Sequence, residues 1–181
     1  MSTLTNIFIG FLPHNHTLNY LSKPSPFEGI DMVLYIRLPE DENKVHYVIK
    51  DSFGLRFFKE EELWKMAYQN TINDATFMNF FGMNVISNED MFLGASRVLS
   101  LDAVRACMES YGTTNLVVIP SSVHEIILVP YHENEDLDYI TGTVKKVNAD
   151  EMSVRQNEIL ADKAFPLDLE KIKEIAAMFA E

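Results

Sequence analysis

From residue 31 onward, the strand-like segments of this sequence come in pairs, and a short polar turn joins the members of each pair. Period-two alternation over 32–38 and 45–49 flanks a turn at 39–43, and further pairs join 83–87 to 91–96 and 116–119 to 123–129. Two such runs around a turn predict a β-hairpin. Three hairpins predict a largely antiparallel sheet, because a doubly wound fold would alternate single strands with helices.

Four other segments carry apolar residues at helical spacing, namely 59–70, 101–111, 136–148 and 168–180. Ser100 has the side chain of an N-cap for the second of these helices, and Gly112 suits the left-handed residue that ends it. The sequence therefore predicts an α+β fold, in which a largely antiparallel sheet built from three hairpins packs against three or four helices.

Residues 1–30 differ from the rest, because Pro13, Pro24 and Pro26 interrupt regular pairing. We expect an irregular N-terminal arm over 1–30 and a single α+β domain over 31–181. The apolar run at 7–12 is short and has no preceding positive charge, so it lacks the pattern of an export signal. No segment approaches the roughly 20 apolar residues that span a bilayer, and we expect a cytoplasmic protein.

The chain is acidic, with 27 Asp and Glu residues against 15 Lys and Arg residues and a formal net charge of −12. This charge disfavours direct binding to nucleic acid through its phosphates. The one cysteine, Cys107, excludes an intrachain disulfide and a cysteine-based zinc site. It falls on the apolar face of a predicted helix, which favours an inert thiol.

Most cofactor and metal motifs are missing. The seven glycines form neither G-x-G-x-x-G nor a phosphate-binding loop. His14 and His16 offer two imidazoles without a further ligand nearby, so we interpret them as part of a solvated loop. We expect no cofactor and no metal.

Reactive side chains concentrate at Ser121, Ser122, His124 and Glu125. They suggest a hydrolase in which a serine is the nucleophile and His124 the base. If 123–129 is extended, however, His124 and Glu125 point to opposite faces, while Ser122 and His124 share one. The structural alternative is a tight turn in which the serines bond to the backbone.

Acidic clusters at 40–42, 60–62 and 132–138 support another reading. Together they could form a negative surface that docks a basic partner or mimics nucleic acid, as an inhibitor of a defence nuclease would.

Several motifs between about residues 55 and 165 occur in a recognisable order. They are Leu63-Trp64 with Ala67 and Asn70-Thr71; Met83-Asn84-Val85-Ile86-Ser87-Asn88 with Gly94-Ala95; Ile119 to Glu125 through Pro130; and Val144, Val147-Asn148 and Leu160-Ala161-Asp162. This succession resembles a bacterial family of unknown function that is common in gut Gram-positive bacteria and on mobile elements. The resemblance implies that Asn88 and the turn containing His124 and Glu125 lie near each other or serve the same surface. Asn70 is a further candidate for a binding surface.

These observations favour a non-enzymatic binding protein over an enzyme, with another protein as its partner. The hydrolase and the acidic inhibitor remain the two alternatives. The sequence does not give the oligomeric state.

Overall fold

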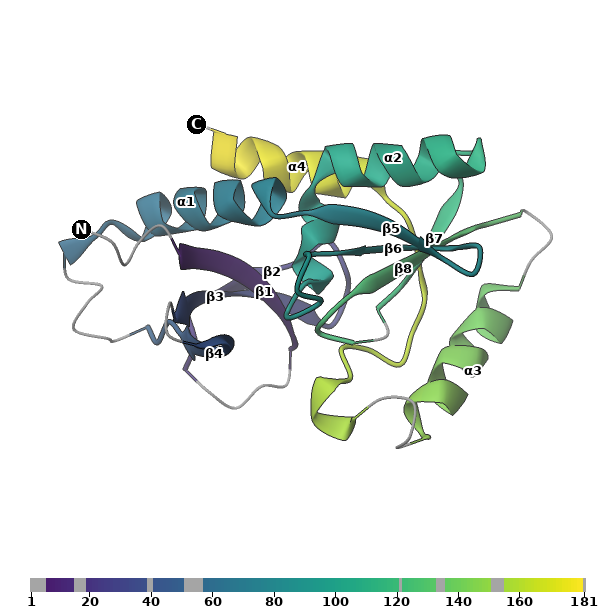
Figure 1. Cartoon of the computed structure of the whole chain (residues 1–181), viewed down its shortest axis with the longest axis horizontal. Coiled ribbons are helices and arrows are strands. Elements are labelled where there is room, and N and C mark those ends of the chain that lie inside the picture. The colour runs from purple at the N-terminus through teal and green to yellow at the C-terminus, as the bar shows by residue number, and fades with distance from the viewer. Residues whose placement is uncertain are drawn as a thin grey trace.

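The computed structural model describes residues 6–14, 19–38, 41–50, 57–120, 122–132, 136–150 and 155–180. It contains two antiparallel sheets and four α-helices, which confirms the predicted α+β class (Figure 1).

The first sheet is centred on β3 (Ile30–Leu38). Strand β1 (Ile7–Pro13) pairs with one edge of β3, while β2 (Ser22–Pro24) and β4 (Asp41–Tyr47) share the other edge. The predicted hairpin of 32–38 with 45–49 is thus present as β3–β4. All these pairings are antiparallel. Because β3 is paired along both edges, it is the interior strand.

The prediction of an irregular arm over 1–30 is wrong for the described residues 6–14 and 19–30, because β1 and β2 both belong to this sheet. Ile7, Ile9 and Phe11 are at most 1% exposed and lie in the main hydrophobic core. Pro13 and Pro24 occupy the last positions of their strands, where a missing N–H is tolerated. The prolines therefore mark strand ends rather than a segment without strands.

The second sheet has the order β5–β6–β8–β7–β9. Its strands are β5 (Thr76–Phe80), β6 (Met83–Ser87), β7 (Leu116–Ile119), β8 (Ile126–Pro130) and β9 (Phe165–Pro166). The predicted pairing of 116–119 with the segment after 123 is present as β7–β8, although β8 begins only at Ile126.

The predicted hairpin of 83–87 with 91–96 is wrong. Strand β6 pairs instead with the preceding strand β5, around a two-residue turn at Phe81 and Gly82. Residues 95–99 form the short 3-10 helix η3 (Ala95–Leu99). The apolar residues of 91–96 lie in a largely buried loop and at the start of a helical turn, and a short buried segment of this kind has the same sequence pattern as a buried strand.

The four helices lie close to their predicted positions, as α1 (Glu60–Asn73), α2 (Leu101–Tyr111), α3 (Leu137–Asn148) and α4 (Leu169–Ala180). Ser100 caps α2 by accepting a bond from the Ala103 N–H, and Gly112 ends it at φ 65°. Helices α1, α2 and α4 lie on one side of the sheets and α3 on the other (Figure 1).

Helix η3 lies where the two sheets meet. All five of its residues are buried, and it contacts β1 of the first sheet as well as β6 and β8 of the second. One hydrophobic cluster contains residues of both sheets and of α1, α2 and α4. The joint between the sheets is therefore packed as core.

Candidate functional site

The loop at 88–94 and the segment 122–125 pack against each other, as the family resemblance implied for Asn88 and His124. Ser87 Oγ donates to the carbonyl oxygen of His124 at 2.7 Å. A Cβ added to Gly94 would lie 2.5 Å from that same carbonyl oxygen, so only glycine fits there. The two segments are thus in direct backbone contact.

Residues 122–125 form a bend rather than part of a strand. Ser122 Oγ accepts a bond from the main-chain N–H of His124 at 3.0 Å. This is the hydroxyl-to-backbone turn of the structural alternative. The predicted extended geometry, which sent His124 and Glu125 to opposite faces, therefore does not describe this segment.

The imidazole of His124 is held by a hydrogen bond at Nδ1 and has a carboxylate near Nε2. Nδ1 accepts from the Leu93 N–H at 3.1 Å, which places the proton of the neutral ring on Nε2. Nε2 lies 3.6 Å from Oε1 of Glu158, and the Phe92 ring centroid lies 5.5 Å from that of His124. The ring thereby ties the 88–94 loop to the segment before β8.

The serine–histidine arrangement of the hydrolase hypothesis receives no support from this geometry. Ser122 Oγ accepts from the backbone amide of His124 and is not positioned by the imidazole. Ser121 lies outside the described residues. Glu125 is half-buried, and the carboxylate that approaches His124 belongs to Glu158 instead.

Asn70 and Asn88 serve different parts of the fold. Asn70 Nδ2 donates to the Ile7 carbonyl at 2.8 Å and joins α1 to β1. Asn88 closes its own loop, because its side chain accepts from the Phe92 N–H and donates to the Phe92 carbonyl. Asn88 is fully buried. Asn70 is half-buried, so both amides have structural contacts and only that of Asn70 is partly exposed.

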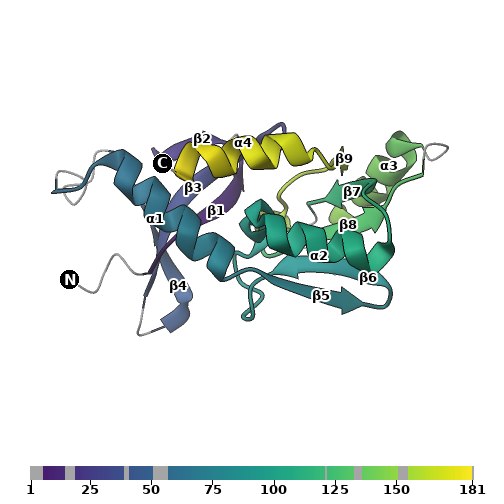
Figure 2. The same cartoon turned by 90° about the horizontal axis from the view of Figure 1, so that it is seen from above.

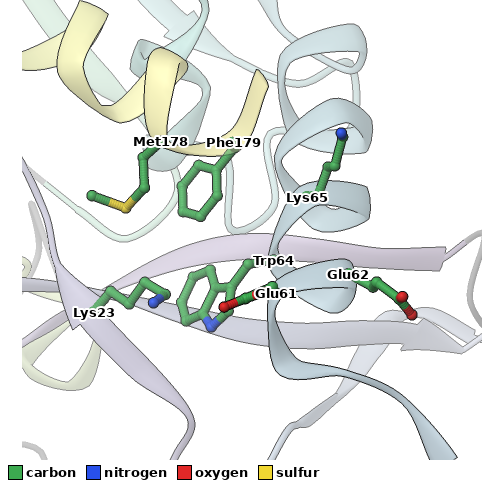
Figure 3. Close-up of a pocket in the computed structure, with 7 residues that line it drawn as sticks. All are labelled: Lys23, Glu61, Glu62, Trp64, Lys65, Met178 and Phe179. Atoms are coloured by element: carbon green, nitrogen blue, oxygen red, sulfur yellow. The ribbon is translucent and has the colours of Figure 1, made fainter. Parts of the chain in front are cut away.

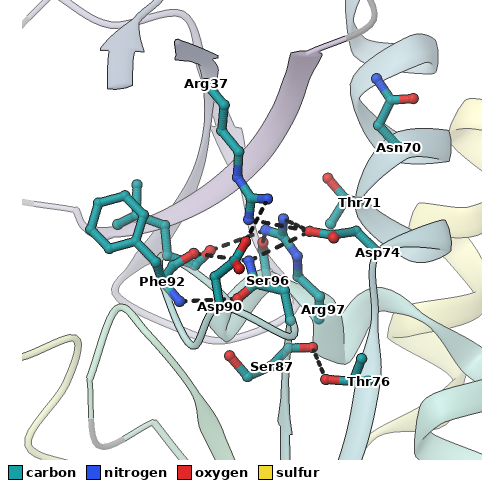
Figure 4. Close-up of polar contacts among 12 residues, drawn as sticks. Arg37, Asn70, Thr71, Asp74, Thr76, Ser87, Asp90, Phe92, Ser96 and Arg97 are labelled. Atoms are coloured by element: carbon teal, nitrogen blue, oxygen red, sulfur yellow. Dashed lines mark hydrogen bonds and ion pairs between the residues drawn. The ribbon is translucent and has the colours of Figure 1, made fainter. Parts of the chain in front are cut away.

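Beside this loop lies a charged network that the sequence reasoning missed (Figure 4). Arg97, on η3, is 0% exposed and forms an ion pair with Asp74 at the C-terminal end of α1. Arg37 on β3 approaches Asp74 at 3.3 Å and Asp90 at 3.4 Å. Two guanidinium groups and two carboxylates thus meet where β3, α1 and the 88–94 loop converge.

Arg97 also holds the backbone around it. Its Nη1 donates to the carbonyl of Leu93 at 3.0 Å and to the hydroxyl of Tyr35 at 3.1 Å. Each of these partners belongs to a different element, so one side chain joins η3 to its flanking loop and to β3. The available signal was a single charged residue, Arg97, in the otherwise uncharged stretch from Leu93 to Leu101.

The turn between β5 and β6 exposes aromatic side chains. Phe80 is 46% exposed, Phe81 is 102% exposed and Met83 is 43% exposed. Phe81 has φ 50° and Gly82 has φ 86°. Positive φ at both central residues of a two-residue loop is typical of a type I′ turn, where Asn-Gly is the preferred pair.

A groove of ≈ 490 Å³ lies between the start of α1, the end of α4 and β2 (Figure 3). Trp64 and Phe179 stack at 5.9 Å beneath it, and the Lys23 ammonium lies 5.5 Å from the Trp64 ring centroid. Lysines and glutamates both line the opening. Its mixed charge favours no class of ligand.

The described part of the chain offers neither a metal site nor a reactive thiol. No group of three or more His, Cys, Asp and Glu side chains is placed there to hold a metal ion. His14 Nδ1 instead contacts Asp31 at 3.0 Å, and His16 lies outside the described residues. Burial raises the pKa of Cys107 to about 12, so the thiol stays protonated at neutral pH.

Within the described ranges, none of the helices combines the length and the apolar character needed to cross a bilayer. No curated protein and no solved structure matches the chain. A family model described as a family of unknown function matches residues 37–168, which include the 88–94 loop, the His124 turn and the β5–β6 hairpin. The chain therefore belongs to this family of unknown function, DUF5688.

Proposed function

We propose that this protein is a non-enzymatic binding protein that contacts a partner protein through the tip of the β5–β6 hairpin. The tip consists of Phe80, Phe81, Gly82 and Met83. The observation that carries the proposal is Phe81, a bulky side chain that is 102% exposed on a residue with φ 50°.

This position works against the stability of the isolated chain. Left-handed backbone costs a residue with a Cβ roughly 1–2 kcal/mol, and asparagine or glycine would relieve the strain. The exposed ring also gains nothing from burial. Aromatic residues dominate the binding energy of protein interfaces, so a partner that covers Phe81 would give the strained residue a function.

The surroundings of Phe81 suit an apolar contact. None of the 27 acidic and 15 basic residues lies between Ala75 and Asn88, although the chain has a net charge of −12. Phe80 and Met83 are register partners at the base of the turn, so their side chains share one face of the hairpin. The tip is thus a neutral apolar projection on an acidic molecule.

The contacts of His124 favour a structural role over a catalytic one. A base must accept a proton from its nucleophile, but Nδ1 already accepts from the Leu93 amide. Nε2 is directed toward Glu158 at 3.6 Å. The hydrolase alternative would therefore require the imidazole to leave its present bonds.

The acidic-inhibitor alternative requires the acidic clusters to form one surface, but two of the three lie far apart. Glu60, Glu61 and Glu62 occupy the first turn of α1, and Asp138 lies in the first turn of α3. These two turns lie at opposite ends of the molecule (Figure 1). Side chains at 40–43 and residues 133–135 lie outside what the structure describes.

The remaining parts of the proposal rest on composition. The acidic charge supports a partner that is a protein rather than a nucleic acid. We also propose a cytoplasmic location, which the single cysteine supports, and a bacterial or mobile-element origin, which the motif resemblance supports.

A photo-reactive benzoylphenylalanine placed at position 81 tests the proposal in the cells that make the protein. Tyr139 on α3 is 77% exposed and serves as the control position. We expect a protein adduct from position 81 and none from position 139. The cross-linked partner is then purified, and its affinity for the folded protein is measured.

The variant Phe81→Asn provides the decisive comparison. It should raise the free energy of unfolding by about 1 kcal/mol, because asparagine tolerates the left-handed region. It should also weaken partner binding at least tenfold, since about 1.4 kcal/mol separates each decade. Equal binding by Phe81→Asn and the parent protein would refute the proposal.

A further inference from the structure

Strand β5 is an edge strand with an open hydrogen-bonding side. It is the first strand in the sheet order and pairs only with β6 among the described strands. Figure 2 shows it as the outermost strand of this sheet. Because Phe80 and Met83 close a two-residue turn, they form a hydrogen-bonded pair. Alternation along the strand then directs the N–H and C=O groups of Phe77 and Asn79 away from β6.

This edge lacks the usual protection against pairing. Natural edge strands carry lysines, prolines or bulges that prevent a further strand from adding. Strand β5 reads Thr-Phe-Met-Asn-Phe, and its register with β6 runs without interruption from Thr76 to Phe80. It therefore offers a straight and neutral template for one more strand.

The edge of β5 is uncharged, which makes it compatible with an identical edge. A basic partner would be drawn to the carboxylates of a chain with net charge −12, but no charged residue lies between 75 and 88. Two copies of the chain repel each other elsewhere, and here they can meet without opposing charges. An apolar, uncharged edge is complementary to an identical edge.

We propose that a second copy of this chain adds to β5 in antiparallel fashion, through a two-fold axis at Met78. This inference goes beyond the proposed function, because the contact runs along β5 (Thr76–Phe80) and does not include Phe81. Phe77 then lies opposite the partner's Asn79, and both residues direct their main-chain groups across the axis. Met78 lies opposite the partner's Met78, and Phe80 opposite the partner's Thr76.

The contact is small, since a five-residue strand spans about 17 Å. Stable interfaces bury about 1,200–2,000 Å². We therefore expect a reversible dimer that forms with rising protein concentration, together with monomer at low concentration.

Charge substitution at the axis tests this register directly. Met78→Lys places two lysines opposite each other, and Met78→Glu places two carboxylates there, so each variant should sediment as a monomer. An equimolar mixture should restore the dimer, because unlike charges then meet. Met178→Lys, at a position 58% exposed on α4, should dimerise like the parent protein.

Cysteine cross-linking provides a second test, because a covalent dimer can be detected even if the substitution lowers the stability of the protein. Opposed Cβ atoms in an antiparallel pair lie within about 5.5 Å, close enough for a disulfide after mild oxidation by copper phenanthroline. Met78→Cys should give a covalent dimer, whereas Met83→Cys at the turn should not. Circular dichroism confirms that each variant is folded.

The outcomes separate this inference from the proposed function. A parent protein that stays monomeric up to millimolar concentration, or folded charge variants that fail to associate when mixed, would overturn the second-copy inference. If position 81 then cross-links a different protein, the proposed function stands alone. If position 81 cross-links nothing, both fail.

Discussion

Replacement of Asp74 by asparagine is the sharpest test of the charged network at the joint between the sheets. Asp74 accepts from Arg97, from Arg37 at 3.3 Å and from Asn88 at 3.4 Å. Arg97 is 0% exposed, so its charge has no access to water. Asp74→Asn keeps the shape of the side chain and removes the charge that neutralises Arg97.

The expected loss follows from the burial of the two partners. Breaking a buried ion pair from one side costs about 3–5 kcal/mol, because the remaining charge stays buried without compensation. The Asp74 side chain is 28% exposed, and solvent reduces the loss toward the lower limit. We expect Asp74→Asn to lower the free energy of unfolding by about 3 kcal/mol. For a chain of this size, the melting temperature should fall by roughly 6–12 °C.

The control is Asp102→Asn on α2, which breaks the ion pair between Asp102 and Arg105. That pair has a distance of 3.3 Å, but the side chain of Asp102 is 94% exposed. Exposed pairs contribute about 0–1 kcal/mol, so this variant should unfold like the parent protein. Urea denaturation followed by circular dichroism measures both. If Asp74→Asn loses no more stability than Asp102→Asn, the network does not hold the joint together.

Three further predictions concern the loop, the thiol and a helix cap. Gly94→Ala should cost about 2 kcal/mol or more in urea unfolding, because the new Cβ would lie 2.0 Å from Ser87 Oγ and 2.5 Å from a backbone carbonyl. Cys107 should resist iodoacetamide at pH 8 in the folded protein and react fully in urea; rapid labelling of the native state would contradict its burial. Because folding raises the pKa of this thiol from 9.0 to about 12, the stability that it contributes is complete below pH 9 and is lost as the pH rises toward 12, which a pH series of unfolding curves would show. Ser100→Ala should lower the melting temperature of the protein through a loss of about 1 kcal/mol, since it removes the bond to the Ala103 amide.

The predictable part of the fold was local. Helix periodicity, the Ser100 cap and Gly112 located α2 to within a residue. Period-two alternation located β3, and a continuous apolar run located β7. Local pattern could not assign partners, however. Which strand pairs with β6 depends on turn geometry, and the deciding turn has phenylalanine where asparagine is usual.

The site was harder to predict because its contacts are distant in sequence. His124 is positioned by Leu93 and Glu158, and no spacing rule joins these residues. Arg97 and Asp74 come together only because α1 ends beside η3. Asn88 and the His124 turn are close in the structure, which periodicity could not indicate, but the burial of Asn88 leaves a shared binding surface a prediction.

Backbone strain separates the structural residues from the proposed functional one. Met91 and Leu93 have φ 51° and 50°, but both lie in the loop that Asn88 closes and that the Leu93–His124 bond fixes. Packing within the chain therefore accounts for their conformation. Phe81 has the same φ and projects fully into solvent, where its side chain gains no comparable contact. The hairpin turn requires this backbone at Phe81 but not a bulky exposed ring, and for this reason we propose the hairpin tip, rather than the more reactive His124 turn, as the contact with a partner.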